Sequence, residues 1–116
     1  MQEQIEEWFD QADQLLFTDA KYDEAHKLYN KILEQEPDNV DAINSITYCI
    51  KFKAGDKLSE ANFNELVRLH EQVLKIDEQD IEANFNMGLL FLQDDRDLTK
   101  ALKYFSASVA KDNSSN

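Results

Sequence analysis

The side chains that could do chemistry are few and far apart in this sequence. His26 and His70 are its only histidines, and Cys49 is its only cysteine. A catalytic or metal site needs several such groups at fixed spacing, and no His-Glu-x-x-His, Cys-x-x-Cys or glycine-rich phosphate loop is present. We therefore interpret His70 as a histidine at the edge of the core, His26 as partly exposed, and Cys49 as buried and inert.

The acidic run Asp94, Asp95 and Asp97 is the remaining candidate for ion binding. It lacks the spacing, the central glycine and the terminal glutamate of an EF-hand calcium loop. A solvated turn with an acid that caps the next helix explains it better. We expect no catalytic residue, no metal and no cofactor, and hence no enzyme.

Composition restricts the possible partners and compartments. The 116 residues carry a net charge of −12, which argues against binding nucleic acid or anionic lipid, and most of this acid is expected to serve solubility. A single cysteine suits a reducing compartment, and the acidic start of the sequence has no secretory or transit pattern. No apolar run reaches the roughly 20 residues of a membrane helix. These features predict a cytoplasmic protein with no membrane insertion.

Six amphipathic helices must position whatever site exists, because apolar residues recur at three- and four-residue steps in six segments. Two glycines and one proline leave little room for the turns of a β architecture. The apolar stripes are Ile5, Phe9, Ala12, Leu15 and Leu16; Tyr22, Ala25, Leu28, Tyr29 and Ile32; Val40, Ile43, Ile46 and Ile50; Phe63, Leu66, Leu69, Val73 and Ile76; Ile81, Phe85, Met87, Leu90 and Phe91; and Leu98, Ala101, Leu102, Phe105 and Val109.

Breaks between the stripes fall at recognisable turn and capping residues. Pro37 with Asp38 and Asn39 ends the second helix and caps the third. Gly55 ends the third helix, and Ser59 is a suitable N-cap for the fourth. Residues 77–80 and 94–97 form the remaining turns, and residues 113–116 are expected to fray.

An internal repeat relates these segments to one another. Residues 22–42 align with 62–83 and with 98–113, and residues 40–50 align with 81–91. Helix pairs that repeat with a period of 20–50 residues are typical of solenoids. The pattern resembles the tetratricopeptide repeat, whose period is about 34 residues.

The resemblance covers nearly the whole chain. The first repeat (6–39) carries Phe9, Ala12, Leu16, Ala25, Tyr29, Ile32 and Pro37, and the third (81–113) carries Met87, Gly88, Phe91, Ala101, Phe105 and Ser108. The second (40–80) departs from the pattern, because it is several residues longer and has Leu66 and His70 where a small residue and an aromatic are usual. The resemblance implies one all-α domain (1–112), a right-handed solenoid of six antiparallel helices.

In tetratricopeptide domains the first helix of each pair lines a concave groove in which partner segments bind. The resemblance therefore implies a groove with an apolar floor and an acidic rim, to which Glu7, Phe17, Asp41 and Lys51 would also contribute. Its central positions are Asp10, Gln14, Asn44, Tyr48, Phe52, Glu82, Phe85, Asn86, Leu89 and Leu92. Such a groove suits a partner protein that has apolar anchors beside basic residues.

Co-chaperones of this family offer an alternative function. They hold the acidic C-termini of chaperones with lysine and arginine in the groove, whereas the matching positions here include Asp10, Gln14, Glu82 and Asn86. Because these acids would repel an acidic tail, we favour an adaptor or scaffold subunit that binds other proteins.

Both ends of the array offer further surfaces. The last helix is followed by no capping helix in this sequence, so Leu102, Phe105 and Val109 should be partly bare and could contact another subunit. Trp8 in the first helix is either an exposed anchor or packed beneath the second helix.

Overall fold

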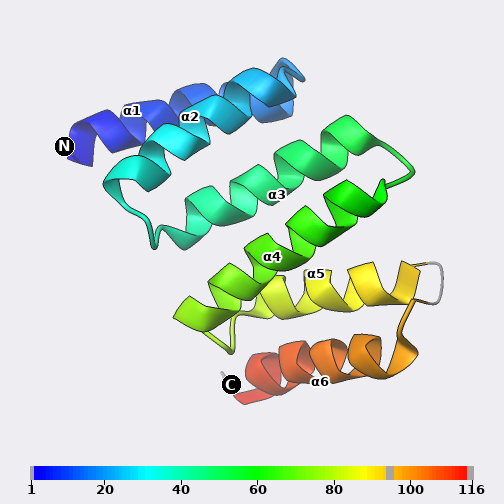
Figure 1. Ribbon diagram of the computed structural model, residues 1–116. Helices are drawn as coiled ribbons and strands as arrows, with labels where there is room; N and C mark the ends of the chain where they lie inside the picture. Colours follow the sequence, from blue (N-terminus) through cyan, green and yellow to red (C-terminus); the bar gives the residue numbers. More distant parts are fainter. Residues whose placement is uncertain (1, 94–95, 115–116) are drawn as a thin grey trace. The chain divides into compact units, whose positions relative to one another are not determined.

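The protein is all-helical in the computed structural model, which describes residues 2–93 and 96–114, with the backbone alone for 111–114. The six predicted helices are confirmed, and the described residues contain no strand (Figure 1). They are α1 (Gln2–Asp13), α2 (Tyr22–Gln35), α3 (Val40–Ala54), α4 (Glu60–Ile76), α5 (Ile81–Leu92) and α6 (Leu98–Ser114). A π-helical turn, η1 (Gln14–Thr18), continues α1. Of the tail predicted at 113–116, residues 115–116 lie outside the described part.

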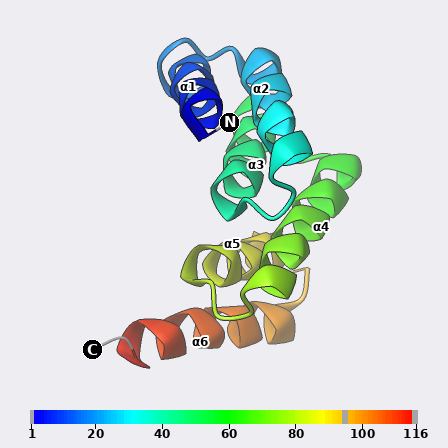
Figure 2. The ribbon, with the colours of Figure 1, turned by 90° about the vertical axis from the view of Figure 1, so that its left-hand side faces the viewer.

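The chain divides into two units, residues 1–62 and 63–116, and the division falls within the second predicted repeat. Unit 1 is built around α2, which packs against α1 on one side and α3 on the other (Figure 2). Alanines are fully buried where these helices meet, at Ala12, Ala25 and Ala42. A side chain this small lets neighbouring helices approach closely, so the packing depends on these positions staying small.

Tyr29 ties α2 to α1 inside unit 1. Its side chain is fully buried, and its hydroxyl donates a hydrogen bond of 2.5 Å to Oδ1 of Asp13. The ring also contacts Phe9, with 6.1 Å between the ring centroids. Tyr29 therefore contributes both apolar contact and a polar link to the first helix pair.

The turns before α3 and α5 share one geometry. The Asn39 side chain accepts a hydrogen bond from the Ala42 N–H at 3.0 Å, and Asp80 accepts one from the Ala83 N–H at 2.8 Å. In both turns the capping residue's own N–H donates to the carbonyl three residues earlier at 3.1 Å. These bonds recur 41 residues apart (39 to 80, 42 to 83), which is the offset of the sequence alignment.

The predicted caps before α4 and α6 are also present, whereas the cap at Asp80 lies in a segment predicted only as a turn. Ser59 Oγ accepts from the Asn62 N–H at 3.0 Å, and Asp97 Oδ1 accepts from the Lys100 N–H at 3.0 Å. The prediction of an acid that caps the last helix is thus confirmed for Asp97. Asp94 and Asp95, the rest of that acidic run, lie outside the described residues.

Unit 2 contains most of α4 together with the antiparallel pair α5 and α6 (Figure 1). Phe91 of α5 lies between two other rings, with centroids 5.7 Å from Phe63 and 6.0 Å from Tyr104. His70 of α4 is fully buried, so it lies deeper than the core edge at which we expected it. Its position in the core rather than at a surface argues for a packing role.

Candidate functional site

The end of the first helix has unusual backbone geometry. In η1 the Asp19 N–H donates to the Gln14 carbonyl at 3.0 Å, and the Lys21 N–H donates to the Leu15 carbonyl at 2.8 Å. Ala20 then takes a φ of 55°, a left-handed conformation that non-glycine residues rarely adopt. This wide turn buries Leu16 and leaves the next residue, Phe17, 61% exposed. Such π-helical turns and strained residues are frequent at functional sites.

Phe17 joins three other rings on the surface of unit 1. We name Phe17, Tyr22, Tyr48 and Phe52 the aromatic cluster. Phe52 is its centre, with ring centroids 6.3 Å from Phe17, 6.1 Å from Tyr22 and 5.8 Å from Tyr48. Phe17 also contacts Tyr48 at 6.3 Å. Because the rings pack on one another and Phe17 and Phe52 are largely exposed, the cluster is a preformed apolar surface.

Charged groups lie beside the aromatic cluster. The Lys51 ammonium lies 5.6 Å from the Tyr48 ring centroid. Lys53 forms an exposed ion pair with Asp23, with Nζ at 2.8 and 3.1 Å from the two carboxylate oxygens. A hydrogen bond and charge attraction from Lys53 lower the pKa of Asp23 below its usual value. The ion pair links the start of α2 with the end of α3, the elements that carry Tyr22 and Phe52.

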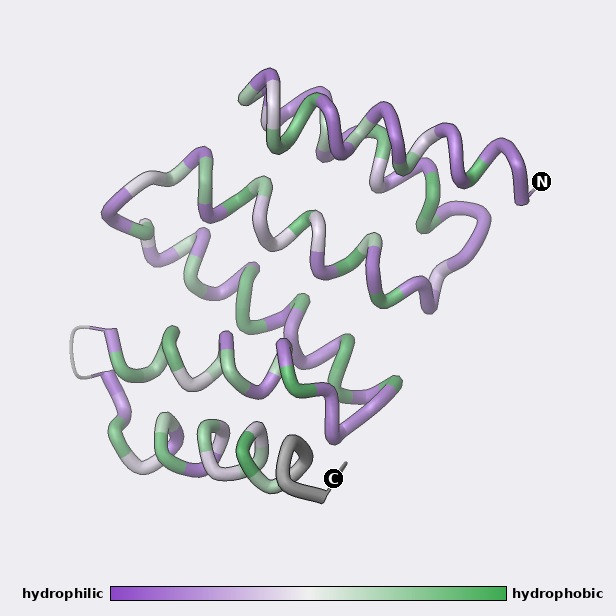
Figure 3. Tube along the Cα trace, turned by 180° about the vertical axis from the view of Figure 1, so that it is seen from behind, coloured by the Kyte–Doolittle hydropathy of each residue, from purple (hydrophilic) through white to green (hydrophobic). Residues whose placement is uncertain are grey.

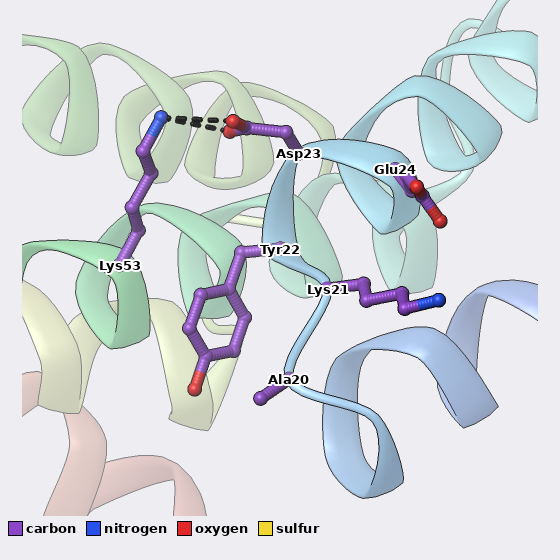
Figure 4. Close-up of a pocket in the computed structure, with 6 residues that line it drawn as sticks. All are labelled: Ala20, Lys21, Tyr22, Asp23, Glu24 and Lys53. Atoms are coloured by element: carbon purple, nitrogen blue, oxygen red, sulfur yellow. Dashed lines mark hydrogen bonds and ion pairs between the residues drawn. The ribbon is translucent and has the colours of Figure 1, made fainter.

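An open pocket of about 300 Å³ adjoins the cluster (Figure 4). Lys53 and Asp23 pair on one side of it, while Lys21 and Glu24 extend away from that pair. Tyr22 and Ala20 complete the lining. The lining combines apolar and charged side chains and includes no cysteine, serine or histidine.

The first helix supplies strong negative charge to the same unit. Five of the twelve residues of α1 are acidic and none is basic. Asp10 and Gln14, both predicted for the groove, are exposed. Unit 1 therefore combines an apolar aromatic cluster with an acidic helix.

Two of the predicted groove residues are buried. Asn44 is 6% exposed and Asn86 is 7% exposed, so little of either side chain could meet a partner. Both lie on the inward faces of their helices, among residues such as Ile43 and Met87 that have no exposed surface. These two residues were assigned to the groove from their positions in the repeat. Position along the sequence does not tell whether other helices bury a polar side chain.

The predicted groove residues of unit 2 lie along α5. Phe85, Leu89 and Leu92 are each exposed by more than two fifths, and Ile81 joins them one turn earlier. Glu82 is half-buried beside them. The structure thus brings together Tyr48 and Phe52 in unit 1, and Phe85, Leu89 and Leu92 in unit 2, as two separate sets.

The last helix exposes apolar side chains as the sequence predicts. Leu102 and Val109 are largely exposed and Phe105 is half-buried, and Leu98 is exposed as well. Trp8 of α1 is half-buried, with the Lys31 ammonium of α2 lying 5.7 Å from its ring centroid. Trp8 is therefore partly covered by the second helix.

Cys49 and His70, two of the side chains with reactive potential, lie in the core. Cys49 is buried as predicted, and burial raises the pKa of its thiol to about 11, so it stays protonated and unreactive near neutral pH. Within residues 2–93 and 96–110, no three His, Cys, Asp or Glu side chains gather as metal ligands would. Among the described helices, none is both long and apolar enough to cross a bilayer.

Sequence reasoning missed Ile81 and Leu98 as exposed residues and Tyr22 as a half-buried member of the aromatic cluster. It assigned each of them to the apolar stripe of its helix, because all three fit the helical period. Each stands at the first position of its helix, where the chain has just left a turn and neighbouring helices cover it less. Their position at the start of a helix is the sequence feature that could have indicated that they are less covered.

Comparison with known proteins adds no family assignment. Neither a protein-family model nor a curated protein sequence matches this chain significantly.

Proposed function

We propose that this protein is a non-enzymatic interaction module, an adaptor or scaffold subunit, that binds a partner segment with apolar anchors and basic residues. The observation that carries the proposal is the aromatic cluster of unit 1, in which Phe17 is 61% and Phe52 44% exposed. Clustered, rigid aromatic side chains are frequent hot spots of protein interfaces, because they bury much area at little entropic cost.

The acidity of α1 and of the chain as a whole favours a basic partner, while the charges beside the cluster, Lys51 and the Lys53–Asp23 pair, are of both signs. All five acids of α1 belong to the same unit as the cluster, and the whole chain carries a net charge of −12. Such a field accelerates encounter with a basic segment and opposes an acidic one. For the same reason the co-chaperone alternative, which requires binding of acidic tails, is disfavoured.

The recurring turns support a tetratricopeptide-like architecture as the framework of this function. Asn39 and Asp80, 41 residues apart, cap α3 and α5 with the same kind of hydrogen bond, and these are the first helices of the second and third predicted pairs. Stacked helix pairs of this kind form a solenoid with preordered surfaces, so that little entropy is lost on their side of a complex. We also propose a reducing compartment, the cytoplasm, because a single cysteine cannot form an internal disulfide.

The test uses two synthetic helical peptides that share leucine anchors and differ in having lysine or glutamate at every charged position. Fluorescence anisotropy would measure the binding of each peptide to the purified chain at low and high salt. We expect the lysine peptide to bind and to weaken as salt rises, because screening reduces charge attraction. The glutamate peptide, which mimics an acidic tail, should bind at least about tenfold more weakly.

Substitutions would locate the binding surface. Phe17→Ala and Phe52→Ala should each weaken binding of the lysine peptide by about tenfold or more, the usual effect at a hot spot. Ile76→Ala is the matched control, since Ile76 is also a large apolar residue and is 41% exposed on α4. Equal affinities for the three variants would refute the proposed surface, and equal affinities for both peptides would refute the preference for basic partners.

A further inference from the structure

Unit 2 carries a second apolar surface that the proposed function does not use. It is formed by one exposed row on each helix of the α5–α6 pair, and Figure 3 shows apolar turns along both helices. We name it the α5–α6 face. Its members are Ile81, Phe85, Leu89 and Leu92 on α5 and Leu98, Leu102 and Val109 on α6, and they are 40–67% exposed.

The two rows form one continuous face because the helices are antiparallel and in close contact. The Ser108 hydroxyl donates to the Ile81 carbonyl at 3.4 Å, which places the end of α6 beside the start of α5. Midway along, the ring of Phe105 lies 5.7 Å from the Phe85 ring, centroid to centroid. The half-buried Phe105 thereby fills the seam between the rows.

The face is nearly free of charge in a chain of which 31% is charged. The only charged residue of α5 is Glu82, which is half-buried beside the row. The described side chains of α6 include two lysines, and both point to rings elsewhere: Lys100 lies 5.1 Å from the Phe91 centroid and Lys103 lies 5.5 Å from that of Tyr104. A basic partner would therefore find little acid on this face.

We propose that the α5–α6 face binds the same face of a second copy of this chain, giving a two-fold symmetric dimer. Two copies of a protein with a net charge of −12 repel each other, so they can associate only through a surface without opposed acids. The α5–α6 face meets this condition. Screening reduces the remaining long-range repulsion at physiological salt.

The size and relief of the face fit such a dimer. Seven large apolar side chains with this exposure leave on the order of 600–700 Å² uncovered, near the ~800 Å² that each partner buries in a standard interface. The α6 row is more exposed (55–67%) than the α5 row (40–47%). In a two-fold pair the prominent α6 row of each copy can pack against the lower α5 row of the other, as paired helices do in a four-helix bundle.

Sedimentation equilibrium of the full chain, between about 1 µM and about 300 µM, tests the proposal in the micromolar range of modest interfaces. We expect a monomer–dimer equilibrium that strengthens as salt is raised, because screening removes repulsion and apolar contacts persist. Leu102→Glu and Leu89→Glu should each raise the dissociation constant by about 100-fold or more, because every dimer would bury two new charges. Ile76→Glu adds the same charge outside the α5–α6 face and should change the dissociation constant by less than about threefold.

Both substituted leucines are exposed, so the variants should fold, and circular dichroism would confirm it. A monomer throughout the concentration range, or equal dissociation constants for the three variants, would overturn the proposal. Open-ended assemblies would overturn the two-fold geometry, since a closed pair cannot extend. The outcome is separable from that of the peptide experiment, because the two binding events respond to salt with opposite signs and to substitutions in different units.

Discussion

Gly88 of α5 lies directly against the ring of Phe105 of α6. A Cβ atom at Gly88 would be 2.6 Å from both Cδ1 and Cε1 of that ring and 2.9 Å from Cζ. Carbon atoms in ordinary contact are about 3.5–4.0 Å apart, so no larger residue fits unless the ring moves. The close approach of α5 and α6 therefore depends on the missing side chain at Gly88.

Replacing this glycine should destabilise unit 2. We expect Gly88→Ala to lower the free energy of unfolding by about 1–3 kcal/mol, the usual cost of overpacking a tight contact. The gain in helix propensity from alanine, about 1 kcal/mol, offsets part of the strain. Urea denaturation followed by circular dichroism would measure the change.

A double variant identifies the ring as the cause. Phe105→Leu removes the atoms with which the new methyl group collides, so Gly88→Ala should cost less in that background than in the native one. An equal cost in both backgrounds would mean that the Phe105 contact does not limit the residue at position 88.

The two equivalent caps should contribute similarly to stability. Asn39→Ala and Asp80→Ala each remove a side chain that accepts the N–H of the third residue along, in Ala42 and Ala83. We expect each substitution to lower the free energy of unfolding by about 1 kcal/mol. Chemical denaturation of both variants would provide the measurement.

Asp38→Ala is the control for these caps, since it removes an exposed polar side chain next to Asn39. It should change the free energy of unfolding by less than about 0.5 kcal/mol. If it costs as much as Asn39→Ala, general loss of polarity and not capping accounts for the effect.

The sequence predicted the helices and caps well because both depend on local patterns. Ser59 was predicted as a cap, and Asn39 and Asp97 were each among the residues predicted to cap a helix. Such predictions succeed because capping needs only a short polar side chain before an apolar stripe. Gly88 was identified through the repeat alignment. Its contact with Phe105 could not be predicted in detail, because the distance between two helices depends on all the side chains between them.

The candidate site was less predictable for a similar reason. Phe17 and Phe52 were expected at a groove, but the π-helical turn that exposes Phe17 has no established sequence signature. Helical period alone also failed to separate covered from uncovered positions. Polar residues are usually exposed and apolar residues buried, yet Asn44 is buried and Leu98 is exposed. Tertiary packing decides the exposure of both.

The exposed ion pair near the aromatic cluster should be measurable by titration. Lys53 lowers the pKa of Asp23, so Lys53→Met should raise that pKa towards its ordinary value. Nuclear magnetic resonance of the side-chain carboxyl carbon would follow the titration in both proteins. Because both partners are largely exposed, the urea midpoint should stay the same, and an unchanged Asp23 pKa would show that the pair does not persist in solution.

Stability should fall in alkaline solution because two buried acids resist deprotonation. Burial raises the pKa of Cys49 to about 11, and burial together with the bond to Asp13 raises the pKa of Tyr29 above its usual range. In the unfolded chain these groups lose their protons near pH ~8.5 and ~10. Above about pH 8.5 the unfolded state therefore binds fewer protons than the folded state, and the free energy of unfolding decreases as pH rises.

Variants separate the two contributions to this decrease. Cys49→Ala should remove the part that begins near pH ~8.5, so that its stability declines only from about pH 10. Tyr29→Phe should keep the early decline and lose the later part that belongs to the phenol. Urea midpoints measured between pH 8 and pH 11 under reducing conditions would show both effects, with exposed lysines titrating equally in all three proteins. If Cys49→Ala declines from the same pH as the native chain, deprotonation of the buried thiol is not what opposes folding in that range.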